Sequence, residues 1–551
     1  MRVRVTPERA RVDYVQSLDD DPSKRNVVES YTLEPRTANP TTRGASAPRE
    51  TPGATSPRTP EEPTSPRKRR ATDDEARGGR RDRAREGVEG PLADRSVILG
   101  RPTADSVAVS VRSSTAVEAF VEYAMHADTK SDVRGSKSPI VACPAGTPTV
   151  IELTGLKSDT RYEYRLHVRA PGATAFVADE PASFVTARAA GRTFTFGVQG
   201  DSHPERSGKM YAPELYERTL KQAASDALDF YVTLGDDFSI ERLIERDTLS
   251  QESVDRVYAH QRGFLGIVGR SSPLFLVNGN HEEAAGYLLD GTADNAAVYA
   301  GRARTRHFPL PTPSPFYTGD AEEIEHVGLL SDYYAWTWGD ALFVVIDPYW
   351  HSRVQVDADA GGGGKGEARG GKAGGRRDMW GITLGEAQYR WFAKTLSESH
   401  ARHKFVFAHH VLGTGRGGVE VADLYEWGGR DPRGGDAFAA KRPGWELPIH
   451  ALMAKHGVTV FFQGHDHLFA RQEKDGVVYQ ETPNPADSTY QAFNRDAYRS
   501  GDVLPNAGYL RVTVAPEKVR VDYVRCYLPG DEPEGVTSGD VAFSYTIPAA
   551  K

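Results

Sequence analysis

Cysteine is scarce in this chain, and long apolar runs are missing from it. Only Cys143 and Cys526 are present among 551 residues, which excludes a disulfide-stabilised scaffold and a zinc site built from thiolates. No stretch approaches the roughly 18 consecutive apolar residues that a membrane-spanning helix needs. The sequence therefore predicts no transmembrane segment.

A large excess of charge of one sign is also missing. The chain has 68 Lys and Arg against 76 Asp and Glu, a formal net charge of −8, so we expect no nucleic-acid binding beyond a substrate that is itself a nucleotide. Hydrophobic residues make up 38% and the mean hydropathy is −0.53, which is polar for a fully folded chain. The 16 histidines, by contrast, leave room for a metal site of histidine and carboxylate ligands.

Aromatic residues are absent between Tyr31 and Phe120, and eight prolines fall within residues 35–66. A basic run at residues 67–70 and a mixed-charge stretch follow. Such a segment buries too little apolar surface to offset the entropy of ordering it. We therefore predict that residues 36–92 are a disordered linker.

Residues 1–35 repeat the end of the chain, about residues 510–548. Residues 1–15 match residues 510–524 at ten positions, and Ser30-Tyr31-Thr32 matches Ser544-Tyr545-Thr546. Both copies are typical of a β-hairpin around a Pro-Glu turn, followed by a third strand. Our hypothesis is that residues 1–35 are the stranded tail of a related upstream domain; the alternative is an extra strand pair that docks on the edge of the catalytic domain.

Residues 93–190 contain short alternating segments separated by turn-rich sequence, which predicts an all-β sandwich. The segments are Val107–Val111, Val117–Tyr123, Thr149–Leu153, Arg161–Val168 and Ser183–Thr186. The stretch from Leu153 to Arg165 resembles the tyrosine corner of fibronectin type III domains. This resemblance implies that the Tyr162 hydroxyl returns to upstream backbone.

Residues 191–551 change to compact apolar runs of the buried-strand type, followed by helical patterns. Amphipathic helices are predicted over Glu214–Leu228 and Gly385–Leu396, and residues 357–377 are a Gly-rich flexible insert. The predicted strands are Phe194–Gln199, Phe230–Leu234, Leu274–Val277, Leu342–Ile346, Lys404–Ala408 and Val458–Gln463. The fold class is therefore α/β after an all-β sandwich.

Five of these strands end in a polar cluster. The clusters are Gly200-Asp201-Ser202-His203, Gly235-Asp236-Asp237, Gly279-Asn280-His281-Glu282, His409-His410 and Gly464-His465-Asp466-His467. In open α/β folds ligands bind beyond strand carboxyl ends, so the clusters are expected to converge on one crevice. Their Asp, Asn and His donors, without sulfur, suit Zn, Mn or Fe.

This ordered set resembles the calcineurin-like metallophosphoesterase superfamily, and the preceding sandwich makes the chain most similar to its purple acid phosphatase branch. The resemblance covers about residues 93–551. It implies an αββα sandwich of two mixed sheets that carries two metal ions. It also implies that one metal is held by Asp201, Asp236 and His467 and the other by Asn280, His409 and His465, with Asp236 bridging.

One position departs from the purple enzymes. They carry a tyrosine ligand three residues after the bridging aspartate, where this chain has Ser239. The resemblance to non-purple members implies that His203 replaces that ligand. We therefore expect two divalent or mixed-valence ions of Fe, Mn or Zn, without the purple phenolate colour.

The predicted activity is a metal-dependent phosphoesterase in which a metal-bridged hydroxide attacks phosphorus in line. His281 is predicted as general acid or phosphate-oxygen donor, oriented by Glu282. His410 is an alternative to His409 as ligand. We expect a phosphomonoesterase acting on a small phosphate ester; the alternatives are a phosphodiesterase for nucleotides or phospholipids and, more remotely, a binding protein with a degenerate phosphatase domain.

Two features of the sequence bear on localisation, and they point in opposite directions. Residues 1–8 lack the apolar region of a secretory signal, whereas the family resemblance favours an extracytoplasmic protein.

Overall fold

The computed structural model describes residues 2–5, 10–16, 26–33, 94–126, 135–356, 379–412 and 415–549. The predicted linker over 36–92 and the insert over 357–377 lie outside the described residues. The chain forms two compact units, residues 1–81 and residues 82–551.

The first unit contains a three-stranded antiparallel sheet, β1 (Arg2–Val5), β2 (Ala10–Gln16) and β3 (Asn26–Leu33). Its backbone register reproduces that of the C-terminal strands β26 (Gly508–Ala515), β27 (Lys518–Arg525) and β28 (Val541–Pro548). Arg2 pairs with Asp13 as Arg511 pairs with Asp522. Each copy also has a register shift at the same place, between Tyr14 and Val15 and between Tyr523 and Val524. The repeat thus extends from sequence to strand pairing; its origin stays a hypothesis.

The second unit contains a mixed nine-stranded sheet in the order β28-β27-β26-β13-β14-β15-β4-β5-β9. Its centre is parallel: β13 (Phe194–Gln199), β14 (Tyr231–Thr233) and β15 (Leu274–Leu276) run in the same direction. These strands lie where the apolar runs predict them. Because they are parallel, their carboxyl ends lie at one edge of the sheet.

A second mixed sheet has eight strands in the order β16-β19-β20-β21-β22-β24-β23-β25. Its parallel part comprises β20 (Ala341–Val345), β21 (His403–Phe407), β22 (Val460–Gln463) and β24 (Val477–Glu481). The flanking strands are β16 (Thr318–Gly319), β19 (Tyr334–Trp338), β23 (Phe469–Lys474) and β25 (Asp502–Leu504).

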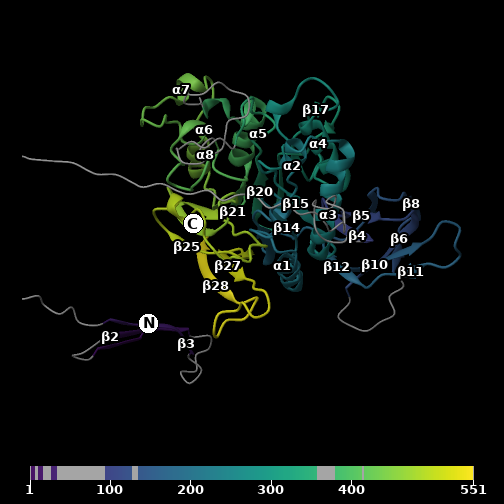
Figure 1. Ribbon diagram of the computed structural model, residues 1–551, viewed down its shortest axis with the longest axis horizontal. Helices are drawn as coiled ribbons and strands as arrows, with labels where there is room; N and C mark the ends of the chain where they lie inside the picture. Colours follow the sequence, from purple (N-terminus) through teal and green to yellow (C-terminus); the bar gives the residue numbers. More distant parts are fainter. Residues whose placement is uncertain are drawn as a thin grey trace, which may run out of the picture. The chain divides into compact units, whose positions relative to one another are not determined.

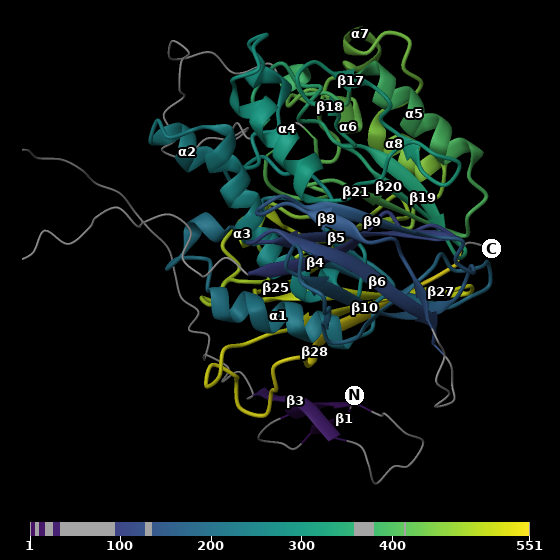
Figure 2. The same cartoon turned by 90° about the vertical axis from the view of Figure 1, so that its right-hand side faces the viewer.

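The two sheets pack face to face through a core rich in aromatic side chains. Phe196 of β13, Phe343 of β20 and Phe407 of β21 belong to this core and are fully buried. Helices cover the outer faces, as Figures 1 and 2 show: α1 (Pro213–Ser225), α3 (Gln251–Gly269) and α4 (Ala296–His307) on the first sheet, and α5 (Gly385–Glu398), α6 (Tyr425–Gly428) and α8 (Ile449–Lys455) on the second. The predicted αββα arrangement is confirmed.

The amphipathic patterns explain how the helices attach. In α1, Leu215, Tyr216 and Leu220 are buried against the first sheet, which is the spacing of one helical face. The longest helix, α3, begins at a capping box in which the Ser250 side chain accepts from the Ser253 N–H, an arrangement that satisfies free backbone donors of the first turn.

The all-β segment packs as two layers. Strands β6 (Val117–Met125), β7 (Ser136–Lys137), β8 (Val141–Cys143), β10 (Arg161–Arg169), β11 (Val177–Ala178) and β12 (Ala182–Val185) form one sheet, and β4 (Arg95–Gly100), β5 (Ser106–Ser113) and β9 (Thr149–Thr154) face it across a separate core. The Lys157 N–H donates to the Tyr162 hydroxyl at 2.8 Å, so this hydroxyl contacts upstream backbone; the resemblance to fibronectin type III stays a prediction. However, Gly100 of β4 pairs with Leu274 of β15. The all-β segment therefore shares a sheet with the segment that begins at residue 191, whereas the predicted domain division treats the two as separate.

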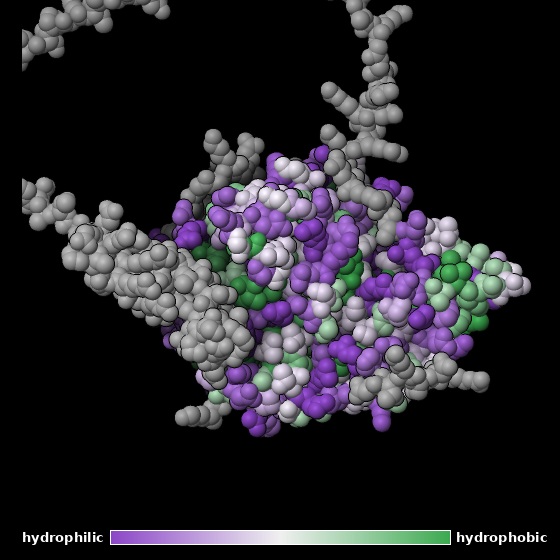
Figure 3. Space-filling view, turned by 90° about the horizontal axis from the view of Figure 1, so that it is seen from below, coloured by the Kyte–Doolittle hydropathy of each residue, from purple (hydrophilic) through white to green (hydrophobic). Residues whose placement is uncertain are grey.

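The surface of the second unit is mainly polar in the view of Figure 3, and exposed apolar side chains gather at the end formed by the all-β segment. Met125, Ile140, Val150 and Val177 are the large exposed apolar residues among the described residues of that segment. Among the described residues, no helix combines the length and apolar character that a membrane crossing requires.

Candidate metal centre

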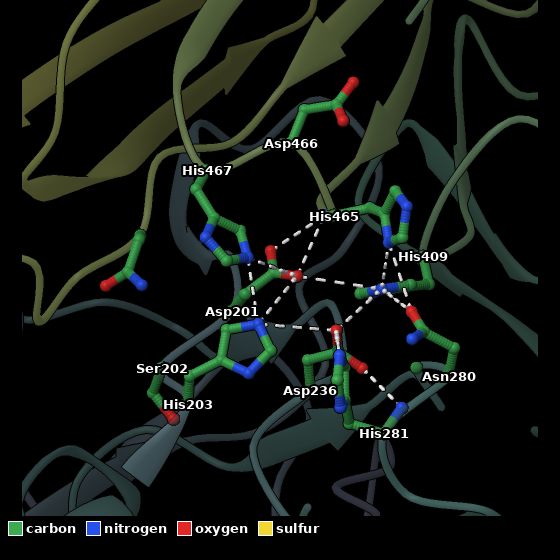
Figure 4. Close-up of polar contacts among 12 residues, drawn as sticks. Asp201, Ser202, His203, Asp236, Asn280, His281, His409, His465, Asp466 and His467 are labelled. Atoms are coloured by element: carbon green, nitrogen blue, oxygen red, sulfur yellow. Dashed lines mark hydrogen bonds and ion pairs between the residues drawn. The ribbon is translucent and has the colours of Figure 1, made fainter. Parts of the chain in front are cut away.

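The five polar clusters lie at the carboxyl ends of parallel strands from both sheets. Those after β13, β14 and β15 come from the first sheet, and those after β21 and β22 come from the second. Figure 4 shows the side chains of the seven predicted ligands turned toward one another from different strands. All seven residues predicted as ligands are nine-tenths or more buried.

Asp201, His203 and His467 form one group whose ligand atoms lie close enough together to hold an ion. The Nε2 atoms of His203 and His467 are 2.9 Å apart. Asp201 Oδ1 lies 3.7 Å from His467 Nε2 and 3.9 Å from His203 Nε2.

Asp236, His409 and His465 form a second such group. His409 Nε2 is 3.2 Å from His465 Nδ1. Asn280 joins them through Oδ1, which lies 3.0 Å from His409 Nε2 and 3.1 Å from His465 Nδ1.

Asp236 connects the two groups. Its Oδ2 lies 3.5 Å from His203 Nε2, in the first group, and 3.2 Å from His409 Nε2, in the second. A carboxylate in this position can reach ions on both sides, which is the arrangement expected of a bridging ligand.

Two of these histidines are held through their other ring nitrogen. His203 Nδ1 faces Glu205 Oε1 at 2.8 Å, and His409 Nδ1 faces the Leu234 carbonyl oxygen at the same distance. Such outer contacts fix the ring orientation of metal-binding histidines. They leave both Nε2 atoms directed at the centre.

The backbone at these strand ends adopts strained or crowded conformations. His203, Asp236, His465 and His467 all have a positive φ, which is uncommon for such residues and recurs at functional sites. At Gly464 a Cβ atom would come within 2.6 Å of Asp201 Oδ2. Glycine is therefore needed there for the chain to pass the Asp201 carboxylate, which also accepts the His465 N–H at 2.8 Å.

Burial and neighbouring charges shift the pKa values of the side chains at the centre. The pKa of Asp201 is raised to about 7 by burial and by the neighbouring Asp236. Burial lowers the pKa of His409, but Asp236 and Asp201 outweigh it and raise this pKa to about 10. The two buried carboxylates thus attract positive charge to the space between the groups.

His281 is placed beside the centre, but its carboxylate partner differs from the predicted one. Its Nε2 lies 3.8 Å from Asp236 Oδ2, and its Nδ1 faces Glu241 Oε2 at 3.0 Å. Glu282 instead accepts backbone N–H groups of Asp236, Asp237, Phe238 and Gly279. Adjacent residues turn to opposite sides of the loop, so the residue next to His281 in sequence does not orient its ring.

His410 lies outside the two groups. Its ring stacks on Tyr349 with centroids 6.0 Å apart, and its Nδ1 is 3.2 Å from the Tyr349 hydroxyl. Burial lowers its pKa to about 3. The geometry therefore favours His409 over His410 as the ligand.

The two other acidic residues of the clusters also turn away. The Asp237 carboxylate accepts from the Ser202 hydroxyl at 2.5 Å. Asp466 accepts from the Tyr498 hydroxyl and the Gly417 N–H, and Figure 4 shows its side chain directed outward.

The donor set fits a pair of transition-metal ions. Four histidine nitrogens, two carboxylates and an amide oxygen converge in a buried space, and nitrogen and oxygen donors of this mixture suit Zn, Mn or Fe. His467 Nδ1 has no hydrogen-bond partner among the described residues, whereas its Nε2 faces the centre.

Residues from outside the clusters also line the centre. Glu205 lies only two residues after His203, so its contact with His203 could have been predicted from the sequence. Glu241 and Tyr349 approach from α2 (Glu241–Glu245) and from the segment after β20. Nothing local in the sequence connects either residue with His281 or His410.

Comparison with known proteins shows similarity of fold. No family model matches the chain, and no curated protein matches it. A solved structure described as PhoD aligns with a TM-score of 0.54 and 15% identity over 82% of this chain and 90% of the other. Purple acid phosphatase PPD1 from yellow lupin (Lupinus luteus) seeds aligns with a TM-score of 0.50 and 14% identity, over 82% of this chain and 74% of the other. The chain therefore has a purple acid phosphatase-like metallophosphoesterase fold, as the ordered motifs predict.

Proposed function

We propose that this protein is a binuclear metal-dependent phosphoesterase and, more specifically, a phosphomonoesterase. The observation that carries the proposal is the position of Asp236 Oδ2, 3.5 Å from His203 Nε2 and 3.2 Å from His409 Nε2. A buried carboxylate between two buried groups of donors suits a site for two neighbouring cations. The fold shared with PhoD and with a purple acid phosphatase supports the same reaction class.

In this proposal Asp201, His203 and His467 would hold one ion and Asn280, His409 and His465 the other, with Asp236 shared. The ions would be Fe, Mn or Zn. When bound, a metal pair activates a water molecule for in-line attack and neutralises phosphoryl oxygens.

His281 would supply the proton for the leaving group, or a hydrogen bond to a phosphate oxygen. Its ring is buried, and the contact of Nδ1 with Glu241 at 3.0 Å leaves Nε2 directed toward Asp236. In this structure Nε2 accepts from Arg206 Nη2 at 3.0 Å, since a guanidinium can only donate. His281 can therefore act as a general acid at Nε2 once this contact is exchanged for the substrate and Nε2 is protonated. Glu241 is thus proposed as the carboxylate that orients the ring, and Glu282 as a support of the ligand loop.

The main test compares a monoester and a diester of p-nitrophenol. The protein is loaded with Mn, Zn or ferrous iron, and its metal content is measured. We expect faster turnover of the monoester, abolished by a chelator, and a roughly 10²–10⁴-fold loss of kcat in His281→Ala. His126→Ala, at an exposed histidine of the all-β segment, is the matched control.

Three outcomes separate the alternatives. Preference for the diester would assign a phosphodiesterase instead. Failure to hydrolyse either ester with two metals bound would favour a binding protein. An active protein unaffected by His281→Ala would remove His281 from the mechanism.

A second test addresses the ligands themselves. We expect His409→Ala to bind about one metal ion fewer than the wild type, because His409 faces both Asp236 and Asn280. His410→Ala is the neighbouring control and should keep both ions. Loss of metal only in the His410 variant would reverse the assignment.

A further inference from the structure

Arg206 lies at the margin of the candidate metal centre, on the short 3-10 turn η2 (Pro204–Arg206) that follows the first polar cluster. Its Nη2 is 3.0 Å from His281 Nε2, and its Nε is 3.3 Å from Glu205 Oε1. Its side chain is 28% exposed. The side chain is thus anchored at the margin of the centre and is partly exposed to solvent.

The anchoring connects Arg206 with both halves of the site. Glu205 Oε1 also faces His203 Nδ1 at 2.8 Å, so one oxygen atom holds both the histidine and the arginine. His281 Nε2, the other contact, lies 3.8 Å from Asp236 Oδ2. Arg206 therefore stands beside the place where the proposed reaction brings a phosphoryl group.

The guanidinium keeps hydrogen-bonding capacity for a ligand. Its Nη2 donates to His281 Nε2 at 3.0 Å and its Nη1 to the Met210 sulfur at 3.6 Å, while its Nε forms an ion pair with Glu205 Oε1 at 3.3 Å. Within the described part of the chain, one N–H of Nη1 and one N–H of Nη2 make no further hydrogen bond. Two N–H groups on one planar guanidinium match the spacing of phosphate oxygens.

We propose that Arg206 binds a non-bridging oxygen of the substrate phosphoryl group and so favours phosphomonoesters over phosphodiesters. This inference rests on the proposed phosphoesterase function. A monoester carries a charge of about −2 near pH 7, whereas a diester carries a single negative charge. Because the attraction to a fixed cation scales with the ligand charge, Arg206 stabilises the monoester more strongly.

The test uses Arg206→Met and Arg206→Lys with the monoester and diester of p-nitrophenol. Both substrates release the same phenol, so a mere change in the position of His281 would lower both rates equally. We expect Arg206→Met to lower kcat/KM for the monoester about 10- to 100-fold and for the diester less than about 3-fold. Arg206→Lys should recover part of the monoester rate, because lysine keeps the positive charge but lacks the two parallel N–H groups of a guanidinium.

Arg256→Met is the matched control, since Arg256 lies on the exposed face of α3 and pairs with Glu252. It should behave as the wild type with both esters. Equal losses for monoester and diester in Arg206→Met would overturn the inference and leave Arg206 as a positioning residue for His281. Unchanged rates for both would overturn it as well.

A binding measurement separates this inference from the proposed function. Isothermal titration of the metal-loaded protein with orthophosphate should give about 10-fold weaker binding in Arg206→Met, with metal content and Tm equal to those of the wild type. Equal phosphate affinity would contradict the role of Arg206. If the wild type hydrolyses neither ester, the proposed function fails, while the phosphate titration still decides whether Arg206 binds the anion.

Discussion

Glu282 holds the backbone of Asp236: its Oε2 accepts the Asp236 N–H at 3.0 Å. Asp236 sits there in a left-handed conformation, with φ of 58°. The same carboxylate accepts three further N–H groups, from Asp237, Phe238 and Gly279. Glu282 therefore fixes the loop that presents the bridging carboxylate, rather than the histidine next to it in sequence.

Glu282→Gln is expected to weaken metal binding about 10- to 100-fold. The amide keeps one acceptor oxygen but turns an NH2 group against backbone N–H donors, so at least two buried donors lose their partner, at a cost of about 2–4 kcal/mol in unfolding free energy. Metal content after dialysis and Tm measure both effects. Glu252→Gln, on the exposed side of α3, is the control, and wild-type metal retention in the Glu282 variant would contradict this role.

The iron-loaded protein is expected to lack the purple colour of tyrosinate-bound ferric iron. Ser239 occupies the place three residues after Asp236 where the purple enzymes carry tyrosine. The nearby hydroxyl of Tyr349 is directed at His410 Nδ1, 3.2 Å away. A visible charge-transfer band in protein of known iron content would show that some phenolate binds the metal after all.

Removal of residues 1–92 is expected to leave Tm and phosphoesterase activity of the remaining chain nearly unchanged. Strands β26–β28 already complete the nine-stranded sheet, and β26 pairs with β13 over Phe194–Val198. Thermal unfolding and kcat/KM of the shortened and full chains give the comparison. A large loss of either would favour the alternative in which residues 1–35 dock on the catalytic domain.

His260 is expected to make the fold sensitive to mild acid. It is 5% exposed within α3, packs edge-on against Phe264, and burial lowers its pKa to about 4. The unfolded chain binds a proton near pH 6.5 while the folded chain does not, so stability is lost as pH falls from about 6.5 toward 4. At pH 5 this amounts to about 2 kcal/mol.

Urea unfolding of the metal-free protein at pH 7 and pH 5 measures this effect. In His260→Gln the fall in unfolding free energy between the two pH values should be smaller by about that amount. His126→Gln, at an exposed position, should keep the full wild-type dependence. Identical falls in the wild type and in His260→Gln would exclude His260 as the cause.

Parallel strands and their polar ends were predictable because their signal is local. An apolar run such as Phe194–Gln199 matches β13 in full, since a strand buried on both faces needs no long-range pattern to reveal it. Helices α3 and α4 were not predicted. Their polar side chains interrupt the apolar periodicity: Arg262, for example, is fully buried and donates to Ser96 and Ser110 of the all-β segment.

The linear order of motifs was enough to predict the metal-binding donors and the type of fold, because each donor follows the strand that carries it. Only tertiary packing settled which side chains meet across those strands. Glu241 reaches His281 and Glu282 turns to the Asp236 backbone, although Glu282 is the sequence neighbour. Likewise Gly100 joins the all-β segment to the sheet of β15. Such contacts depend on how segments far apart in the sequence pack together, and a local sequence pattern contains no information about that packing.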